Sequence, residues 1–97
     1  MPKLPCVYIV TNRRHGTLYT GVTSELVHRI WQHKNKITGG FTARYNLDKL
    51  VWYEAHQSME AAITREKQLK AGSRTRKLRL IETENPGWED LYEQILG

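Results

Sequence analysis

A glutamate interrupts the apolar side of a helix-forming segment in the second half of the chain. In the stretch that follows Ser58, helical spacing places Glu66 on the same side as four apolar residues. These are Met59, Ala62, Ile63 and Leu69. A carboxylate on a buried side needs a partner. That partner is either a divalent cation, held together with water and phosphate oxygens, or an Arg or Lys in an ion pair, and the sequence leaves both open.

An arginine and a histidine lie one helical turn apart in an earlier segment. Arg29 and His33 have the i, i+4 spacing and share a face with Leu26 and Ile30. The guanidinium could clamp a phosphate and offset charge gained in a transition state, or it could keep its head in water above a buried stem. His33 is either a packed, hydrogen-bonded histidine or a catalytic group. We count both as candidate catalytic residues.

Two tyrosines lie in a predicted β-hairpin. If residues 13–16 form its loop, Val10 faces Tyr19 and Tyr8 faces Gly21, so the two tyrosines emerge on one face as diagonal neighbours. Gly21 would then leave open space beside the Tyr8 ring. A loop one residue shorter or longer would place the tyrosines on opposite faces. Strand tyrosines are usually packing residues, so their meaning depends on the rest of the constellation.

The elements that must position these residues can be read from patterns of residue type. The first half predicts two strands, a helix that begins after Ser24 as its N-cap, a glycine-containing loop and a third strand. Their ranges are Val7–Asn12, Thr17–Thr23, Glu25 to about Lys34, Lys36–Asn46 and Leu50–Tyr53.

Three helices are predicted in the second half. The first runs from Ser58 to Gly72, with glycine as its C′ residue, and the second follows Ser73 and ends before Pro86. Asn85 and Pro86 open the third, whose apolar stripe is Trp88, Leu91, Tyr92, Ile95 and Leu96. The order ββαβααα predicts an α+β fold, with a small three-stranded antiparallel sheet covered by helices. We expect residues 1–97 to form a single domain.

Charge is distributed unevenly along the chain. The net charge is +5, yet residues 1–80 hold all 15 Lys and Arg with five acids, and residues 81–97 hold the other five acids. The densest basic run contains Arg65, Lys67, Lys70, Arg74, Arg76, Lys77 and Arg79. Such a run is typical of phosphate neutralisation by nucleic-acid-binding proteins, and equally of a solvated helix face.

Other classes of protein are disfavoured by composition. The apolar runs fall short of the roughly 20 residues that a membrane helix needs, and the N-terminal residues lack an apolar signal core. The only cysteine, Cys6, excludes an internal disulfide and a multi-cysteine zinc site. We therefore expect a cytoplasmic protein without membrane contact.

Four ordered blocks resemble the GIY-YIG nuclease superfamily, in particular its small stand-alone bacterial members. The blocks are Val7-Tyr8-Ile9, Tyr19-Thr20-Gly21, His28-Arg29-Ile30-x-x-His33 and Arg65-Glu66-Lys67-Gln68-Leu69-Lys70. The resemblance covers nearly the whole chain, including Asn85-Pro86-Gly87-Trp88 near its end. Cys6 stands where the family has the glycine of the first tripeptide, and Thr20 where it has the isoleucine of the second.

The resemblance implies a role for each residue of the constellation. Tyr8 would activate the attacking water and Tyr19 would help to position it. Arg29 would stabilise the charge of the transition state, and Glu66 would hold one divalent cation, magnesium or manganese. Asn85 matches a polar position that some members use near the site, although a helix cap explains it as well.

The implied function is a metal-dependent endonuclease that hydrolyses DNA phosphodiester bonds, in DNA repair or processing; RNA is a further substrate class that the resemblance leaves open. Arg65, Lys67, Lys70, Arg74, Arg76 and Lys77 are the predicted nucleic-acid contacts. One alternative is a non-catalytic nucleic-acid-binding module with the same fold. Another is an interaction protein whose acidic C-terminal helix docks on a basic partner. Nothing in the sequence calls for an obligate protein partner.

Overall fold

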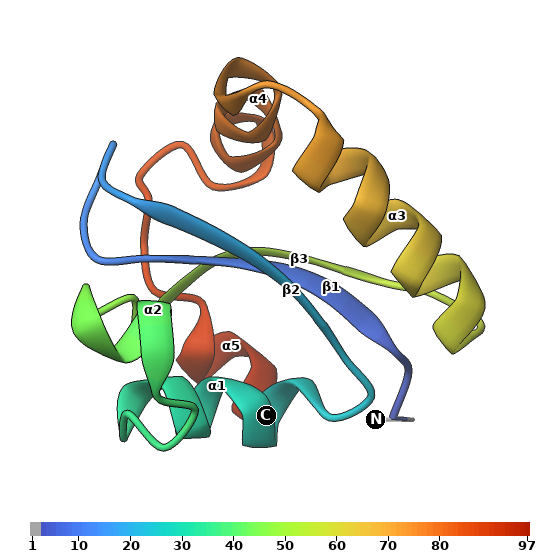
Figure 1. The fold of residues 1–97 in the computed structure, drawn as a ribbon, viewed down its shortest axis with the longest axis horizontal. Coiled ribbons are helices and arrows are strands. Elements are labelled where there is room, and N and C mark those ends of the chain that lie inside the picture. The colour runs from blue at the N-terminus through green and yellow to red at the C-terminus, as the bar shows by residue number, and fades with distance from the viewer. Residues whose placement is uncertain (1–2) are drawn as a thin grey trace.

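The fold is built on a three-stranded antiparallel sheet, seen in a computed structural model that describes residues 3–97 (Figure 1). The strands are β1 (Cys6–Thr11), β2 (Leu18–Thr23) and β3 (Lys49–Ala55), in the order β2-β1-β3. The central strand β1 is buried along its whole length. The predicted α+β fold with an antiparallel sheet and helices is confirmed.

Helices cover both faces of this sheet (Figure 1). One face packs against α3 (Met59–Ala71) and α4 (Arg74–Glu84), and the other against α1 (Leu26–Lys34) and α5 (Tyr92–Leu96). A short helix, α2 (Gly40–Arg44), follows α1. The predicted starts of α3 at Ser58 and of α4 after Ser73 are confirmed, and the hydroxyls of both serines cap their helices by accepting hydrogen bonds from the third residues after them.

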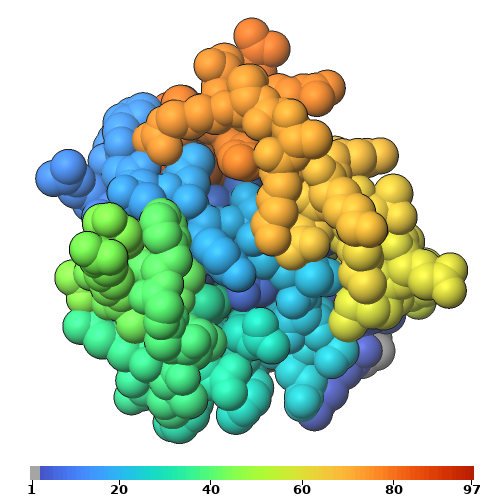
Figure 2. Space-filling view, viewed as in Figure 1, coloured from blue at the N-terminus to red at the C-terminus, as the bar shows by residue number. Residues whose placement is uncertain are grey.

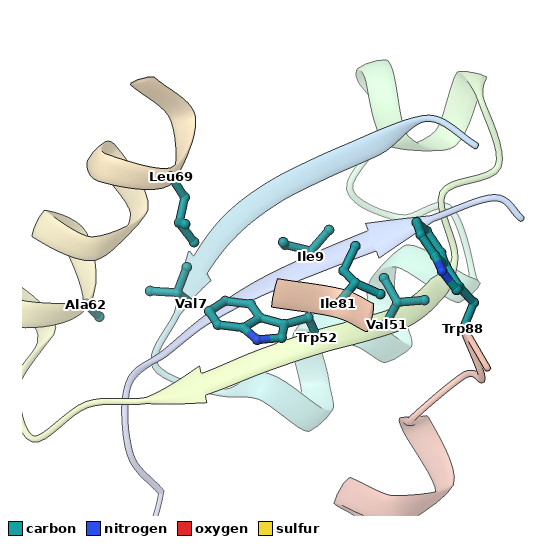
Figure 3. Packing of buried hydrophobic residues seen from close by; sticks show 8 residues of the cluster. All are labelled: Val7, Ile9, Val51, Trp52, Ala62, Leu69, Ile81 and Trp88. Carbon is teal, nitrogen blue, oxygen red and sulfur yellow. The ribbon is translucent and has the colours of Figure 1, made fainter. Parts of the chain in front are cut away.

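Alternating residues of β1 supply the two halves of the core. Val7 and Ile9 pack under α3 and α4, whereas Tyr8 and Val10 face α1 and α5. The first half of the core, shown in Figure 3, consists of Val7, Ile9, Val51, Trp52, Ala62, Leu69, Ile81 and Trp88. Consecutive Val51 and Trp52 both join it, because the pairing of β1 with β3 shifts register after Ile9.

Three local predictions in and around the helices were wrong. The segment Lys36–Asn46 is not a continuous loop, since it contains α2, and the element order is therefore ββααβααα. Ser24 does not cap α1; the hydroxyl of Thr23, at the end of β2, accepts from the Glu25 amide instead. Helix α3 does end at Gly72 as predicted, but this glycine has φ −80° rather than the left-handed conformation of a C′ glycine, because the chain extends there to begin α4 at once.

The predicted last helix begins too early. Asn85 ends α4 instead of capping a new helix, and α5 begins only at Tyr92. Trp88 packs with the α3 and α4 side of the core, while Ile95 packs on the other side. The chain between Trp88 and Ile95 therefore passes around the edge of the sheet at β3, where the Leu91 amide donates to the Leu50 carbonyl. A continuous straight helix could not place both residues on opposite sides of the sheet.

Within residues 3–97, no helix combines the length and the apolar character needed to cross a membrane.

Candidate active site

The hairpin register places Tyr8 and Tyr19 on one face of the sheet. Val10 pairs with Tyr19 and Tyr8 with Gly21, as predicted. The space beside Gly21 is not open, however, because a Cβ atom built there would lie 2.5 Å from the Tyr8 hydroxyl oxygen. The Tyr8 ring itself fills the space, so glycine at position 21 is what allows this tyrosine to lie flat across β2.

A buried hydrogen bond joins Tyr8 to His33. The Tyr8 hydroxyl oxygen lies 2.8 Å from His33 Nε2, and both side chains are almost fully buried. The ring of His33 also contacts the edge of Tyr19, with centroids 6.0 Å apart. Helix α1 therefore holds its histidine against both tyrosines of the hairpin.

Burial keeps both members of this pair neutral near pH 7. Burial raises the pKa of Tyr8 to about 12, although the nearby Arg29 guanidinium acts in the opposite direction. Burial lowers the pKa of His33 to about 4, and the positive charge of Arg29 lowers it further. When Nδ1 of the neutral imidazole carries the proton, the Tyr8 hydroxyl donates to Nε2, and when Nε2 carries it, the hydroxyl oxygen accepts.

Two threonines complete the surroundings of His33. The hydroxyls of Thr38 and Thr42 each lie 3.3 Å from His33 Nδ1 and 3.0 Å from each other. Both hydroxyls can accept from a protonated Nδ1, and in that tautomer Nε2 is left to accept from Tyr8. The sequence prediction missed both residues, although their i, i+4 spacing around Gly39 and Gly40 was a usable signal for a helical turn.

Arg29 and Glu66 approach the same hydroxyl from two helices. Arg29 on α1 lowers the pKa of Tyr8, whereas the negative charges of Tyr19 and Glu66 would raise it. The residues singled out in the sequence as catalytic or metal-binding thus either contact the Tyr8–His33 pair or act on it through their charge.

The Glu66 carboxylate already has a basic neighbour. Lys70 Nζ lies 3.1 Å from Glu66 Oε2, and the glutamate side chain is 14% exposed while the lysine side chain is 50% exposed. Lys70 also lies over the Tyr19 ring, 5.8 Å from its centroid. The ion-pair alternative from the sequence is therefore realised, but no hydrogen bond or ion pair within residues 3–97 engages Oε1 of Glu66.

The carboxylate of Glu66 suits a cation whose other ligands are water and phosphate oxygens. No group of three or more His, Cys, Asp or Glu side chains that could hold a metal exists in the described part of the chain. Magnesium and manganese accept one carboxylate oxygen together with water and phosphate oxygens. One open carboxylate oxygen fits such an ion, and a zinc-type cage does not arise here.

The basic run does not form one uniform surface. Arg65 donates to Glu54 at 3.0 Å, and Arg74 donates to the carbonyls of His15 and Gly16 in the hairpin loop. These two arginines are engaged within the protein. Lys67 and Arg76 are exposed and Lys77 is half-buried.

Asn85 is committed to the backbone. Its side-chain amide donates to the carbonyls of Val51 and Glu89, and its oxygen accepts from the Glu89 amide. The side chain is buried and holds the chain turn after α4 against β3. These contacts account for the asparagine by structure alone.

The molecular surface is hollowed between the segments that carry the site (Figure 2). In this view the green segment after α1 and the yellow to orange segment of α3 flank a depression, with strand atoms in blue at its floor. A separate cavity of about 720 Å³ lies elsewhere, lined by Leu26, Trp31, Tyr53, Ile95 and other residues around the start of α1 and α5, and none of the five site residues lines it.

Comparison with known proteins agrees with this constellation. Residues 4–79 match the model of the GIY-YIG catalytic domain. A UPF0213 protein of Desulfotalea psychrophila is 36% identical over 90 residues, which cover 89% of this chain and 78% of the relative. A UPF0213 protein of Clostridium perfringens is 33% identical over 89 residues, covering 92% and 95% respectively. No solved structure matches significantly. The chain therefore belongs to the GIY-YIG family, among the small bacterial UPF0213 proteins.

Proposed function

We propose that this protein is a divalent-cation-dependent endonuclease that hydrolyses phosphodiester bonds in DNA. The observation that carries the proposal is the buried Tyr8–His33 hydrogen bond, with Arg29 and Glu66 close to the same hydroxyl. A binding module would need only a basic surface. A proton-accepting pair beside a guanidinium and a partly open carboxylate suits phosphate hydrolysis.

Proton transfer in this scheme uses Tyr8 and His33 together. Tyr8 alone is a poor base, because its pKa is about 12 and its ionised form is scarce at neutral pH. With His33 as acceptor, the hydroxyl can take a proton from the attacking water while passing its own proton to Nε2. The water O–H bond breaks as the new P–O bond forms, and the P–O bond to the leaving oxygen breaks in the same displacement. The imidazole gains one proton, and solvent protonates the leaving oxygen.

Protonation of His33 is unfavourable while no substrate is bound. The pKa of His33 is about 4 there, so the substrate must supply the negative charge that makes protonation favourable. A phosphodiester close to Arg29 and Tyr8 brings that charge. The pair is thus inactive as a base until a phosphate is bound, which limits the reaction to the intended substrate.

Arg29 and Tyr19 have supporting roles. The Arg29 guanidinium stabilises the additional negative charge on the phosphoryl oxygens in the transition state. Tyr19 is half-buried beside His33 and orients the attacking water. Both act on the reacting atoms without taking part in covalent chemistry.

Glu66 is the residue we assign to hold magnesium or manganese through Oε1. When bound, the cation supplies Lewis-acid polarisation of a phosphate oxygen and stabilises the leaving oxygen. Lys70 holds the second carboxylate oxygen and keeps the side chain in place. Its ammonium also offsets part of the carboxylate charge while no substrate is present.

Lys67, Arg76 and Lys77 are the residues of the predicted basic run that we assign to nucleic-acid contact, because the structure engages Arg65, Lys70 and Arg74 elsewhere. We expect contacts of this kind to bind phosphates with little regard to sequence. Affinity should therefore fall steeply as salt concentration rises.

The experiment that tests the proposed function is incubation of the purified protein with supercoiled, linear and branched DNA. Reactions contain magnesium, manganese or excess chelator, and an RNA of the same sequence is run alongside. We expect cutting that requires a cation and prefers DNA. Binding without any cutting under all conditions would favour the non-catalytic module instead.

A further inference from the structure

A basic segment without acids surrounds the histidine of the site. Residues 26–47 contain Arg29, Lys34, Lys36 and Arg44 and no Asp or Glu. The same segment carries exposed apolar side chains, including Ile37, Phe41 and Tyr45, which are 55%, 50% and 43% exposed. Exposed rings beside basic side chains are typical of surfaces that bind single-stranded nucleic acid.

The two faces of α2 have different environments, one packed against His33 and the other exposed to solvent. Its inward face places Thr42 against His33, where the hydroxyl is buried. Phe41 is exposed on α2, and Tyr45, four residues later, directly follows the helix and donates its amide to the Phe41 carbonyl. The hydrogen bonds that fix His33 therefore also fix the two exposed rings relative to the site.

The rings form a pair whose faces remain accessible. The centroids of Phe41 and Tyr45 are 4.9 Å apart with an interplanar angle of 49°, so neither ring covers the other. The guanidinium carbon of Arg44 lies 5.7 Å from the Tyr45 centroid. A guanidinium plane beside aromatic rings adds a second type of surface on which a base can stack.

We propose that Phe41 and Tyr45 form a stacking platform for an unpaired base, so that the substrate is DNA with a single-stranded segment next to the scissile phosphate. This inference rests on the proposed function and specifies its substrate class. Phe41 adjoins Thr42 in the chain, and Thr42 is one hydrogen bond from His33. A strand whose phosphate reaches Tyr8 would thus pass close to the rings.

Charge favours a nucleic acid over a protein as the occupant. The rings are flanked along the chain by Lys36 and Arg44. The acids that approach the segment, Asp48 and Asp90, are paired with Lys49 and Lys34. Paired bases in duplex DNA hide their faces, so only an unpaired base can use the platform. The platform consequently distinguishes flapped or single-stranded DNA from fully paired DNA.

The test is equilibrium binding in excess chelator, where no cutting takes place. The probes are a blunt duplex and the same duplex with a single-stranded flap that contains 2-aminopurine, whose fluorescence is quenched on stacking. The native protein is expected to bind the flapped duplex more tightly and to quench the probe. Replacing both rings (Phe41→Leu with Tyr45→Leu) should weaken flap binding by roughly 5- to 150-fold, the range expected for one stacked base.

Matched variants separate stacking from general hydrophobicity. Leucine keeps apolar bulk at both positions, and Phe41→Trp with Tyr45→Trp should restore tight binding and quenching. Trp31→Leu removes another exposed ring, 44% exposed, and should leave flap binding unchanged. Blunt-duplex affinity should be the same in every variant, and melting temperatures confirm that each variant is folded.

Several results would overturn the platform. Equal loss of affinity for both probes, no loss for either, or loss with Trp31→Leu alone would each contradict it. So would a change in self-association of the leucine variant, seen by light scattering, with DNA binding unaltered, because the rings would then contact protein. Because binding is measured without a cation, the two proposals can fail separately. Absence of nuclease activity would contradict the proposed function but would not change the conclusion about flap binding.

Discussion

A buried hydrogen bond joins the Tyr8 hydroxyl oxygen to His33 Nε2 across a distance of 2.8 Å. This contact joins the central strand of the sheet to helix α1, and the Nδ1 side of the same ring joins α1 to the short helix α2 through Thr38 and Thr42. One imidazole therefore connects three elements. Its protonation state governs both the proposed chemistry and the stability of the fold.

The stability of the protein is expected to fall as the pH drops from about 6.5 to about 4. The pKa of His33 is about 4 in the folded protein because of burial, and about 6.5 in the unfolded chain. Between these values the unfolded chain binds more protons, so acid favours unfolding. The loss attributable to this residue is on the order of 3 kcal/mol at pH 4, measured by urea denaturation across this pH range.

A glutamine at position 33 removes this titration. His33→Gln should be less stable at pH 7 but should lose less free energy of unfolding between pH 6.5 and pH 4. His15→Gln is the matched control, because His15 is exposed in the hairpin loop. Equal pH dependence in His33→Gln and the native protein would show that His33 is not buried as a neutral ring.

Glu66→Gln should change stability in chelator by no more than about 1 kcal/mol. Its partner Lys70 is half exposed, so water can solvate the ammonium when the carboxylate is lost. The same variant should abolish the rise in melting temperature that magnesium or manganese produces in the native protein. A loss of 3 kcal/mol or more with cation protection retained would identify Glu66 as a structural ion-pair partner only.

Lys70→Met is expected to bind manganese more tightly in the absence of DNA. Lys70 is paired with Oε2 of Glu66, and its positive charge repels a manganese ion. Removing the lysine side chain therefore leaves the carboxylate available to manganese. Manganese titration followed by electron paramagnetic resonance measures the change directly. Lys67→Met, with the same loss of charge on the same helix, should have a smaller effect, and an equal effect in both variants would indicate only a general change in charge.

Arg74→Ala is expected to lower the free energy of unfolding by roughly 1–3 kcal/mol. Its guanidinium donates to the carbonyls of His15 and Gly16 at 3.0 and 2.7 Å and so ties α4 to the hairpin loop. Arg76→Ala is the control, since Arg76 is exposed, and should change stability by less than about 0.5 kcal/mol. Denaturant titration compares the two variants, and equal stabilities would refute the anchoring role.

Thr20→Val should stabilise the protein. The Thr20 hydroxyl is buried without a hydrogen-bond partner within the described residues, and a methyl group of similar size avoids that cost. A gain of about 1 kcal/mol would raise the melting temperature by roughly 4–8 °C. An unchanged or lower melting temperature would mean that the hydroxyl is satisfied, for example by water.

Local patterns in the sequence were sufficient for the hairpin and for the α3 cap. The assignment of residues 13–16 to the hairpin loop set the register, and the register placed Tyr8 and Tyr19 on one face. Ser58 caps α3 because its side chain needs only the next helical turn. Such features depend on neighbours in the chain and can be predicted without tertiary contacts.

The last helix and α2 depended on contacts between distant residues. By spacing alone, Trp88 and Ile95 fit one helical stripe. In the structure, Trp88 packs on the side of the sheet covered by α3 and α4, whereas Ile95 packs on the side covered by α1 and α5. The α2 turn forms at two glycines because Thr38 and Thr42 meet His33. Likewise, the engagement of Arg65 by Glu54 and of Arg74 by the hairpin loop could not be read from a run of basic residues.

The most direct test of the account is the single-turnover rate of DNA cleavage, measured with enzyme in excess over a labelled flapped duplex in magnesium. The native protein is expected to cut the DNA. Tyr8→Phe and Arg29→Ala are each expected to remain folded and to cut at least about 100-fold more slowly, the scale expected for losing a proton-transfer group or a charge-stabilising donor. Cleavage by Tyr8→Phe at near the native rate, or undiminished cleavage by the native protein in excess chelator, would contradict the account.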